Sequence, residues 1–398
     1  MNTFLLSDFN LPKRKPIRPF EERQDNFNKL FDYDTLFYDI IFKDSKIIFF
    51  APPIDEKSID IILANIFIDM LPLKKFIFKI FKTNKLIKLI IYVDNFSQIQ
   101  LFNKRIKFEK LKHNIDSKNT RVLCTLQKNN PLEWIKDWIL FYIKNHNINL
   151  IIIYDNNSNI YTIDDLKKYL DAINCKIIIV NTLFKYGPQR YNGSAFDSDF
   201  LQSFILEHVR YKYCSNKSFL INVDIDELLI SNKKPIFKYI SKGSSIGLFK
   251  GKWAYIEETN NDKKILHKSH HILDIQSSCP NKWIANLQKM PDRVFLQVHN
   301  VANNFRTIDL DCTVFYIHFK SISTSWKYNR NIKVFFDTEK HIYFNYTNEN
   351  KIIFTINLYN FYELGICTIN STFKNMLNMM KIRIKILLEI VDKSFSSK

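Results

Sequence analysis

Strand-like apolar runs that alternate with helical patterns between residues 120 and 223 constrain the fold of this chain most strongly. The runs predict strands at residues 122–126, 150–154, 176–180 and 218–223. Helices are expected between them, from residue 131, from the capping-box pattern Thr162/Asp165, and over residues 199–214. This alternation predicts a parallel sheet with right-handed crossovers, covered by helices on both faces. Ligands of such an α/β fold bind at the carboxyl ends of the strands.

Flanking modules are expected because 398 residues exceed one ordinary core. Residues 1–117 carry short runs rich in Ile, Phe and Tyr, which predict a small β-rich N-terminal module. The α/β domain is expected over residues 118–335, ending in a helix from about Thr324 to Phe335. Residues 336–398 are expected to form a C-terminal extension with a basic amphipathic helix over residues 373–391. We expect that helix to pack against the body, with membrane contact as the alternative.

The net charge of +18 comes mainly from Lys, in a sequence also crowded with Ile, Asn and Phe. An AT-rich coding sequence gives this residue usage, so the charge carries little weight as evidence of function. A basic protein is nevertheless attracted to phosphates on nucleic acid, on a nucleotide or on an anionic membrane.

The six cysteines are scattered, with no pair at CxxC spacing, and they are expected to be reduced thiols. The N-terminal residues lack the basic start and apolar stretch of a signal peptide, and no apolar run approaches the length of a membrane span. These features predict a cytoplasmic protein and leave peripheral contact with the inner face of the membrane open.

The strongest chemical signal is Asp224-Ile225-Asp226-Glu227, directly after the fourth predicted strand. Three carboxylates within four residues repel one another unless a cation lies between them. Oxygen ligands suit Mn²⁺ or Mg²⁺, which keep positions open for phosphate oxygens. The pattern therefore indicates a metal site, with an acidic turn at a strand end as the alternative.

Two further groups fall at strand ends. Asp155, in Tyr154-Asp155-Asn156-Asn157-Ser158, ends the second strand, where its carboxylate could bind a nucleobase or ribose; an Asx turn is the alternative. His318 and Lys320 end a run that begins at Thr313. His318 could complete a metal site and Lys320 could neutralise a diphosphate, whereas a buried core histidine is the alternative.

The positions of the glycines argue against a nicotinamide oxidoreductase and against a P-loop NTPase. All six lie at or after Gly187, so the turn near Gln127 and Lys128 is neither a GxGxxG dinucleotide turn nor a P-loop. The sequence also has no GxSxG elbow and no HExxH pattern.

Together these blocks resemble a bacterial GT-A glycosyltransferase of the family 92 (DUF23) and family 2 type. The resemblance covers about residues 120–335, and the blocks that carry it are Lys128-Asn129, Trp138-Ile139, Tyr154-Asp155-Asn156-Asn157-Ser158, Asp224-Ile225-Asp226-Glu227-Leu228 and His318-Phe319-Lys320-Ser321. One position departs from the family pattern: Asn130 stands where an acidic residue is expected after Lys128-Asn129. This departure puts the identity of the donor in doubt.

The resemblance implies a GT-A (Rossmann-like) nucleotide-sugar-binding domain that moves a sugar from a nucleotide-sugar donor to a glycan, a lipid-linked glycan or another acceptor. It implies assistance by Mn²⁺ or Mg²⁺ and inversion at the anomeric carbon, which needs a general base. Candidate residues are, for the metal, Asp224, Asp226 and His318; for the donor, Lys128, Asp155, Asn156, Asp224 and Lys320; and for catalysis, Glu227, Glu257, Glu258 and Asp292. Trp253 and Trp283 are candidates for stacking on a sugar, or for core packing.

Three other functions remain open at this point. A nucleic-acid-binding protein would explain the net charge but not an acidic cluster at a strand end. A metal-dependent phosphohydrolase or nuclease could use Asp224, Asp226 and His318, although such sites often hold two metals and need more ligands. A non-catalytic subunit with the fold of a transferase is the third, since fold does not fix function.

Overall fold

The computed structural model describes residues 4–106, 109–110, 120–188, 199–231, 234–240, 245–258, 264–288, 290–302, 305–310, 314–322, 333–337 and 340–355. The predicted helix at Phe373–Val391 lies outside these residues, as do Cys312 and Cys367. The four described cysteines, Cys124, Cys175, Cys214 and Cys279, are free thiols.

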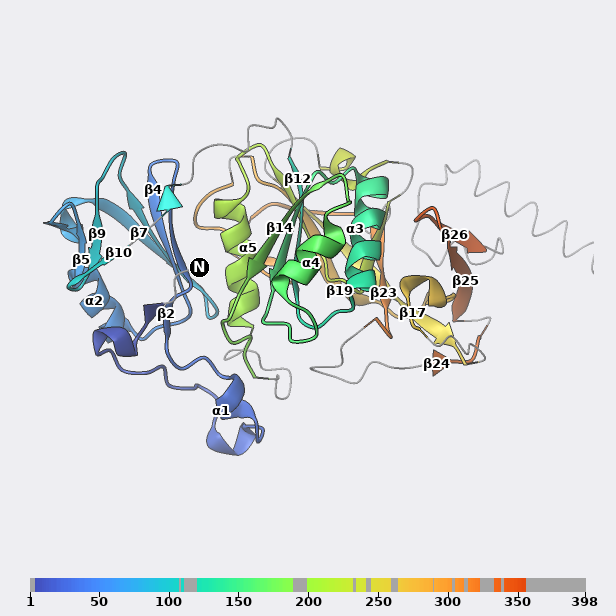
Figure 1. Ribbon diagram of the computed structural model, residues 1–398, viewed down its shortest axis with the longest axis horizontal. Helices are drawn as coiled ribbons and strands as arrows, with labels where there is room; N and C mark the ends of the chain where they lie inside the picture. Colours follow the sequence, from blue (N-terminus) through green and yellow to red (C-terminus); the bar gives the residue numbers. More distant parts are fainter. Residues whose placement is uncertain are drawn as a thin grey trace, which may run out of the picture.

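The centre of the molecule is the predicted α/β sheet (Figure 1). Its parallel part has the strand order β14-β13-β12-β15, with bounds Lys176–Asn181, Leu150–Asp155, Arg121–Gln127 and Phe219–Asn222. These bounds agree with the sequence prediction to within one or two residues. The strands contain apolar runs because both faces of the sheet are covered. The domain therefore has the Rossmann-like α/β fold expected from the sequence.

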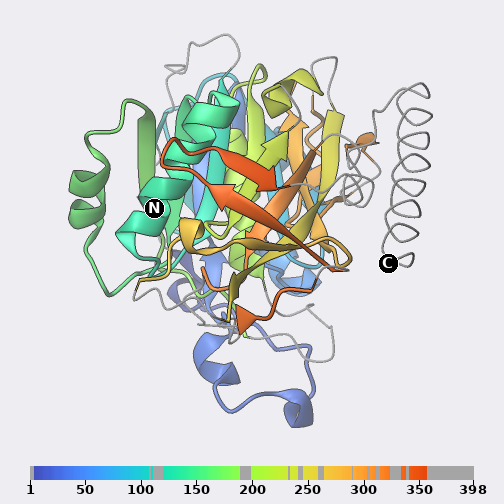
Figure 2. The same ribbon diagram turned by 90° about the vertical axis from the view of Figure 1, so that its right-hand side faces the viewer.

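Side chains alternate between two cores along these strands, as a two-residue repeat requires. Helices α3 (Leu132–His146) and α4 (Ile163–Leu170) cover the face that carries Leu123, Ile151 and Ile221. Both helices lie together on one side of the sheet (Figure 2). Helix α5 (Phe200–Lys212) covers the opposite face. The capping box of α4 forms as predicted, with Thr162 and Asp165 each bonding the other's backbone.

Beyond β15 the sheet continues with antiparallel neighbours, which local sequence patterns do not predict. β19 (Cys279–Asn286) pairs with β15, and β17 (Ser245–Glu257) pairs with β19. β16 (Glu227–Ser231) and β23 (Val314–Phe319) form an antiparallel pair, and β23 also lies along β17. The other strands of this sheet are β18 (Ile272–Asp274), β22 (Thr307–Asp309), β24 (Lys333–Val334), β25 (His341–Tyr346) and β26 (Ile352–Thr355). β20 (Phe295–Leu296) and β21 (Val301–Ala302) form a separate two-stranded sheet.

Strand β24 corrects the predicted helix from Thr324 to Phe335. Residues 323–332 lie outside the described part of the chain, but Lys333 and Val334 pair with Ile256 and Glu257 at the end of β17. The pairing with β17 places these two residues in a strand, and tertiary pairing of this kind overrides local helical spacing.

Residues 4–106 form sheets of their own. The five-stranded sheet has the order β11-β3-β4-β8-β7, with bounds Glu109–Lys110, Asp39–Lys43, Lys46–Ala51, Ile87–Tyr92 and Ile77–Lys82. A second sheet has the order β10-β9-β5-β6, with bounds Lys104–Ile106, Ile99–Leu101, Ile66–Ile68 and Leu71–Pro72. The other elements are β1 (Phe4–Leu5), β2 (Thr35–Phe37), α1 (Phe27–Leu30) and α2 (Glu56–Ala64).

Helix α5 is packed between the two largest sheets. Tyr38, Ile48 and Phe50 of the N-terminal part share one core with Phe204 and Ile205 of α5. Tyr38 stacks on Phe204, with ring centroids 4.6 Å apart. This shared apolar core holds the N-terminal sheet and the α/β sheet as one packed body. No helix in the described ranges combines the length and apolarity that crossing a bilayer requires.

Candidate functional site

The acidic segment forms a tight turn at the carboxyl end of β15. The backbone N–H of Glu227 donates to the carbonyl of Asp224 at 3.0 Å, and the backbone N–H of Asp224 donates to Glu227 Oε2 at 2.8 Å. The chain then enters β16 at Glu227. The side chain of Glu227 therefore helps to fix the loop that presents Asp224 and Asp226.

Groups from other elements brace the same turn. The Tyr142 hydroxyl of α3 donates to the Glu227 carbonyl at 3.1 Å and accepts from the Leu229 N–H at 3.0 Å. His267 lies with Nε2 3.0 Å from the Ile225 carbonyl. The buried face of α3 thus includes a residue that positions the acidic turn. Such bracing keeps functional side chains in one geometry.

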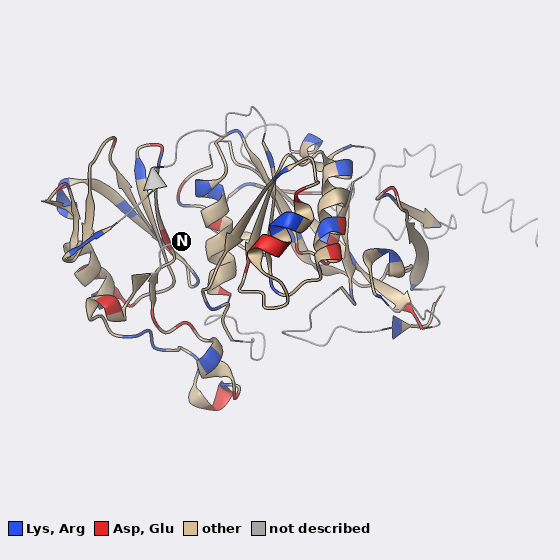
Figure 3. Cartoon of the chain, in the orientation of Figure 1, with Lys and Arg blue, Asp and Glu red and all other residues tan. Residues whose placement is uncertain are grey.

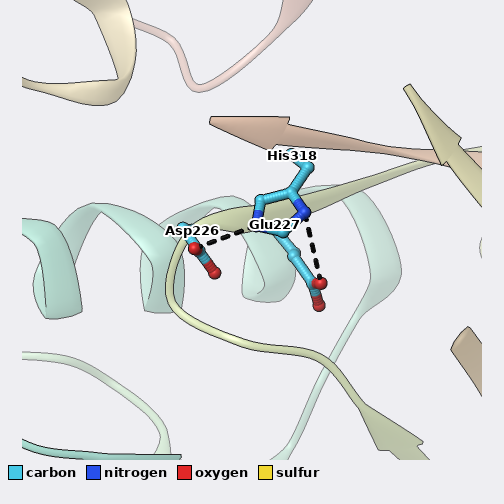
Figure 4. A group of neighbouring side chains, drawn as sticks. All are labelled: Asp226, Glu227 and His318. Carbon is cyan, nitrogen blue, oxygen red and sulfur yellow. Dashed lines mark hydrogen bonds and ion pairs between the residues drawn. The ribbon is translucent and has the colours of Figure 1, made fainter. Parts of the chain in front are cut away.

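His318 comes to this turn from β23, the strand that pairs with β16. Its register places it opposite Glu227. His318 Nε2 lies 3.0 Å from Asp226 Oδ2, and Nδ1 lies 3.9 Å from Glu227 Oε1 (Figure 4). The imidazole stacks on the indole of Trp253, with centroids 4.2 Å apart. Residues 92 positions apart in the sequence therefore meet because β16 and β23 are neighbours.

Lys282, a residue that the sequence analysis missed, completes the cluster. Its Nζ lies 2.7 Å from Asp224 Oδ2 and 2.9 Å from Glu227 Oε2, and its side chain is 1% exposed. The two carboxylates raise its pKa above the ordinary value although burial lowers it. The sequence offered little to single out this residue, because Lys282 is one of many lysines and only its position directly before Trp283 marks it. Only the antiparallel register, with Trp283 opposite Asn222, brings Lys282 to the acidic turn.

Burial dominates the ionisation of Glu227. It raises the pKa to about 7, opposed by Lys282 and His318 and assisted by the charges on Asp224 and Asp226. Asp224, by contrast, has a side chain that is 36% exposed. The cluster therefore has a buried side, where Lys282 meets Glu227, and an open side at Asp224.

Asp226, Glu227 and His318 fit a divalent metal ion. One ligand atom from each of the three lies within 4.8 Å of the others. Carboxylate oxygens and an imidazole nitrogen bind such an ion at about 2.0–2.2 Å, which requires ligand atoms at separations of this size. Asp224, which the sequence analysis also grouped with the metal ligands, pairs with Lys282.

Asp155 and Asn156 hold the loop after β13. Asp155 is 1% exposed, and its carboxylate accepts from the Ser158 N–H at 2.8 Å, the Ser158 hydroxyl at 2.7 Å and the Gln127 amide. Asn156 donates to the carbonyls of Thr182 and Phe184 at 3.0 and 2.8 Å. This is the Asx-turn alternative considered for Asp155. A pocket of about 420 Å³, lined partly by Asp155 and Asn181, lies beside this loop.

The other candidates have different surroundings. Lys128 lies partly exposed after β12. Lys320 places Nζ 3.7 Å from the centroid of the Trp253 ring, the same indole that stacks on His318. Trp283 is fully buried and donates to the Gln297 carbonyl, so it is a core residue.

The candidate bases are separated in space. Glu257 ends β17 and accepts a hydrogen bond from the Tyr343 hydroxyl at 2.8 Å, and Glu258 is exposed beside it. Asp292 lies against the N-terminal sheet, with Lys46 Nζ at 2.7 Å and the Tyr211 hydroxyl at 2.9 Å. Burial raises the pKa of Asp292, but Lys46 and Tyr211 outweigh it, so the pKa falls below its ordinary value. Asp292 is therefore part of the packing between modules.

Comparison with known proteins gives a limited likeness. No profile of a known protein family and no curated protein sequence matches the chain. Among solved structures, S. aureus TarS 1-349 in complex with UDP is 13% identical with a TM-score of 0.30, over 51% of this chain and 60% of that chain. The galactosyltransferase LgtC in complex with donor and acceptor sugar analogs is 11% identical with a TM-score of 0.25, over 43% of this chain and 59% of that chain.

A putative glucose-1-phosphate thymidylyltransferase from Bacillus anthracis is 10% identical with a TM-score of 0.25, over 42% of this chain and 70% of that chain. The match thus spans about three fifths of the TarS chain. TM-scores this low establish neither a family nor an activity, and the fold described above follows from the chain's own sheet.

Proposed function

We propose that this protein is a metal-assisted glycosyltransferase that uses a nucleotide-sugar donor. The observation that carries the proposal is the cluster of Asp226, Glu227 and His318 at the carboxyl end of β15 in a Rossmann-like sheet. Carboxyl ends of parallel strands are where such sheets bind ligands. A divalent ion held there would stabilise the charge that develops on a departing nucleoside diphosphate.

In this proposal, separate groups of residues bind the metal ion, the nucleoside and the phosphates. Asp226, Glu227 and His318 would hold the ion, while Lys282 pairs with Asp224 and Glu227 and so limits the repulsion between the carboxylates. The nucleoside occupies the pocket beside the Asp155 loop. Hydrogen bonds from Gln127 and Ser158 hold the Asp155 carboxylate of that loop in place. Lys320 faces the phosphates from the Trp253 side of the cluster.

Glu257 is our candidate for the general base of an inverting transfer to a hydroxyl of a glycan or lipid-linked acceptor. It lies on β17, the strand that carries Trp253 to the cluster, and the hydrogen bond from Tyr343 fixes its carboxylate. Glu227 is 1% exposed and pairs with Lys282, so it is not our candidate for the base. Glu257→Gln is expected to lower kcat at least about 100-fold with donor binding retained, because a positioned base contributes this much.

Thermal-shift binding tests the proposal directly. UDP, GDP and CMP are each added with and without Mn²⁺ to the wild type and to Asp226→Asn. A stabilisation that needs both one nucleotide and the metal, and is absent in the variant, supports a nucleotide-dependent metal site. Hydrolysis of the matching nucleotide sugar, or transfer from it, then identifies the reaction. Stabilisation by no nucleotide would contradict the proposal.

A further inference from the structure

A second cavity lies between residues 12–17, here called the N-terminal arm, and Phe200, the first residue of α5. Its volume is about 540 Å³, within the range of pockets that hold small ligands. The side chains that form its interior are mainly apolar, among them Leu6, Phe31, Ile54 and Phe200. Leu6, Phe31 and Phe200 are buried and belong to the hydrophobic cores on either side, so they give the cavity fixed walls.

The arm that closes the cavity is a fixed wall. Arg14 is anchored by Nε to the Pro53 carbonyl at 2.6 Å, by one Nη to the Thr35 carbonyl at 2.8 Å, and by the other to the Asp32 carbonyl. Its backbone N–H also donates to the Tyr33 carbonyl at 2.8 Å. Prolines 12, 16 and 19 further restrict the backbone of this arm. The cavity is therefore a built feature of the fold.

The mouth of the cavity is positively charged. Lys13 and Lys15 are exposed on the arm and border the opening, next to Ile17, which is 74% exposed. Basic residues follow this extended segment toward α1 (Figure 3). The one acid at the opening, Asp55, is engaged by the Ser58 N–H at 2.9 Å as the N-cap of α2. An apolar interior behind two lysines complements a molecule with an aliphatic chain and an anionic head.

We propose that this cavity binds one aliphatic chain of an anionic lipid, with its phosphate or carboxylate held by Lys13 and Lys15. The chain displaces water from the apolar interior, and the head remains at the charged mouth. Helix α5 connects parallel strands and so begins at their carboxyl edge, which places Phe200 and the cavity at the same edge as Asp226. The proposal stands on the cavity alone and is independent of the proposed sugar transfer.

Isothermal titration with monomeric dodecyl phosphate, at concentrations below micelle formation, tests this site. Dodecyl maltoside supplies the same chain without the charge, and inorganic phosphate supplies the charge without the chain. We expect the wild type to bind dodecyl phosphate, to bind the maltoside at least about tenfold more weakly, and not to bind phosphate.

Two variants separate the parts of the site. Lys13→Gln/Lys15→Gln is expected to weaken dodecyl phosphate binding at least about tenfold, while Ile54→Trp fills the interior and abolishes it. The matched control is Lys74→Gln/Lys75→Gln, two adjacent exposed lysines elsewhere in the same module, which leaves binding unchanged. Thermal melts of the free proteins show whether each variant is folded.

Three outcomes would overturn the proposal. The first is no binding of the monomeric amphiphile to the wild type. The second is equal loss in the control and the Lys13/Lys15 variant, which would indicate a general effect of charge. The third is binding to vesicles of anionic phospholipid without binding of the monomer, which would indicate a membrane-surface contact in place of a chain-binding cavity.

Discussion

Two buried lysine–glutamate pairs invite comparison, because they have nearly the same geometry in different surroundings. At the acidic cluster, Lys282 lies 2.9 Å from Glu227, with side chains 1% and 2% exposed. Between the N-terminal sheet and α5, Lys88 lies 2.6 Å from Glu207, and both side chains are fully buried. Distance and burial alone do not distinguish them.

The Lys88 pair is enclosed and fully hydrogen-bonded. Lys88 also donates to the carbonyls of Asp292 and Val294 at 2.8 and 2.9 Å. Glu207 accepts from the Leu296 N–H at 2.7 Å and pairs with Arg210 at 3.3 Å. Burial lowers the pKa of Lys88 to about 8, opposed by Glu207 and assisted by Arg210. Cations and acceptors are thus matched without a ligand, as a buried polar network requires.

The Lys282 pair is unbalanced. Lys282 pairs with two carboxylates, those of Asp224 and Glu227, while the third, Asp226, contacts His318, and the Asp224 side chain is 36% exposed. Excess negative charge at an accessible edge favours binding of a cation, whereas the matched network favours only the folded chain. The comparison teaches that the surroundings of a buried ion pair, more than the pair itself, separate a ligand site from a packing element.

The largest expected effect separates the two regions by activity. Asp226→Asn should reduce kcat/KM at least about 100-fold and remove metal-dependent nucleotide binding, because it replaces a charged ligand at the cation site. Asp292→Asn is the matched control, since its carboxylate belongs to the network with Lys46 and Tyr211. It should lower the melting temperature and leave binding intact. Equal loss of binding in both variants would remove the functional distinction.

The second largest expected effect is a loss of folding stability at the Lys88–Glu207 pair. Lys88→Met should destabilise the fold by about 3–5 kcal/mol, because it leaves Glu207 buried without its lysine. Urea unfolding measures the change. Lys88→Met/Glu207→Leu should recover most of the loss, since apolar replacements of a buried pair are often tolerated. A single-variant loss under about 1 kcal/mol would show that Arg210 alone satisfies Glu207.

The sequence predicted the parallel half of the α/β sheet because each strand there is a short apolar run between turns. It also located the acidic turn and His318, since charged or titratable residues at the end of apolar runs are unusual. It did not predict β16, β17, β19 and β23 as a connected sheet, because antiparallel register depends on partners far apart in the sequence.

The burial of Lys88 and of Lys282 could not be predicted from the sequence, for the same reason in both cases. Lys88 and Lys282 look like any other lysine in a chain with a net charge of +18, and only the pairing of β8 with β4 and of β19 with β15 buries them. Pairing across sheets, and not local pattern, decides which lysine is exposed.

Removing Lys282 sharpens the contrast with Lys88. Lys282→Met leaves the carboxylates of Asp224 and Glu227 without their internal cation, and should cost about 2 kcal/mol in EDTA. The cost is limited because Glu227, with a pKa of about 7, can take up a proton. Mn²⁺ should restore much of the stability by supplying the missing charge. The same addition should leave Lys88→Met unchanged, and rescue of neither variant would contradict a cation site at the cluster.

The smallest effect is a difference in alkaline stability. The folded-state pKa of Lys88, about 8, lies below its ordinary value of 10.5, so the unfolded chain binds more protons between these values. Stability contributed by this group therefore rises with pH through that window, by about 1 kcal/mol from about pH 7.5 to about pH 9. Lys282 has the opposite sign: its pKa is raised, so its contribution to stability is fully present below pH 10.5 and is lost only above it.

Urea unfolding of the wild type, Lys88→Met and Lys282→Met across this range should show the wild-type advantage over Lys88→Met growing with pH. Lys282 itself adds no slope in this range, so a slope in the advantage over Lys282→Met reports Glu227, which that variant leaves without its lysine. An advantage over Lys88→Met that stays level with pH would contradict the lowered pKa of Lys88.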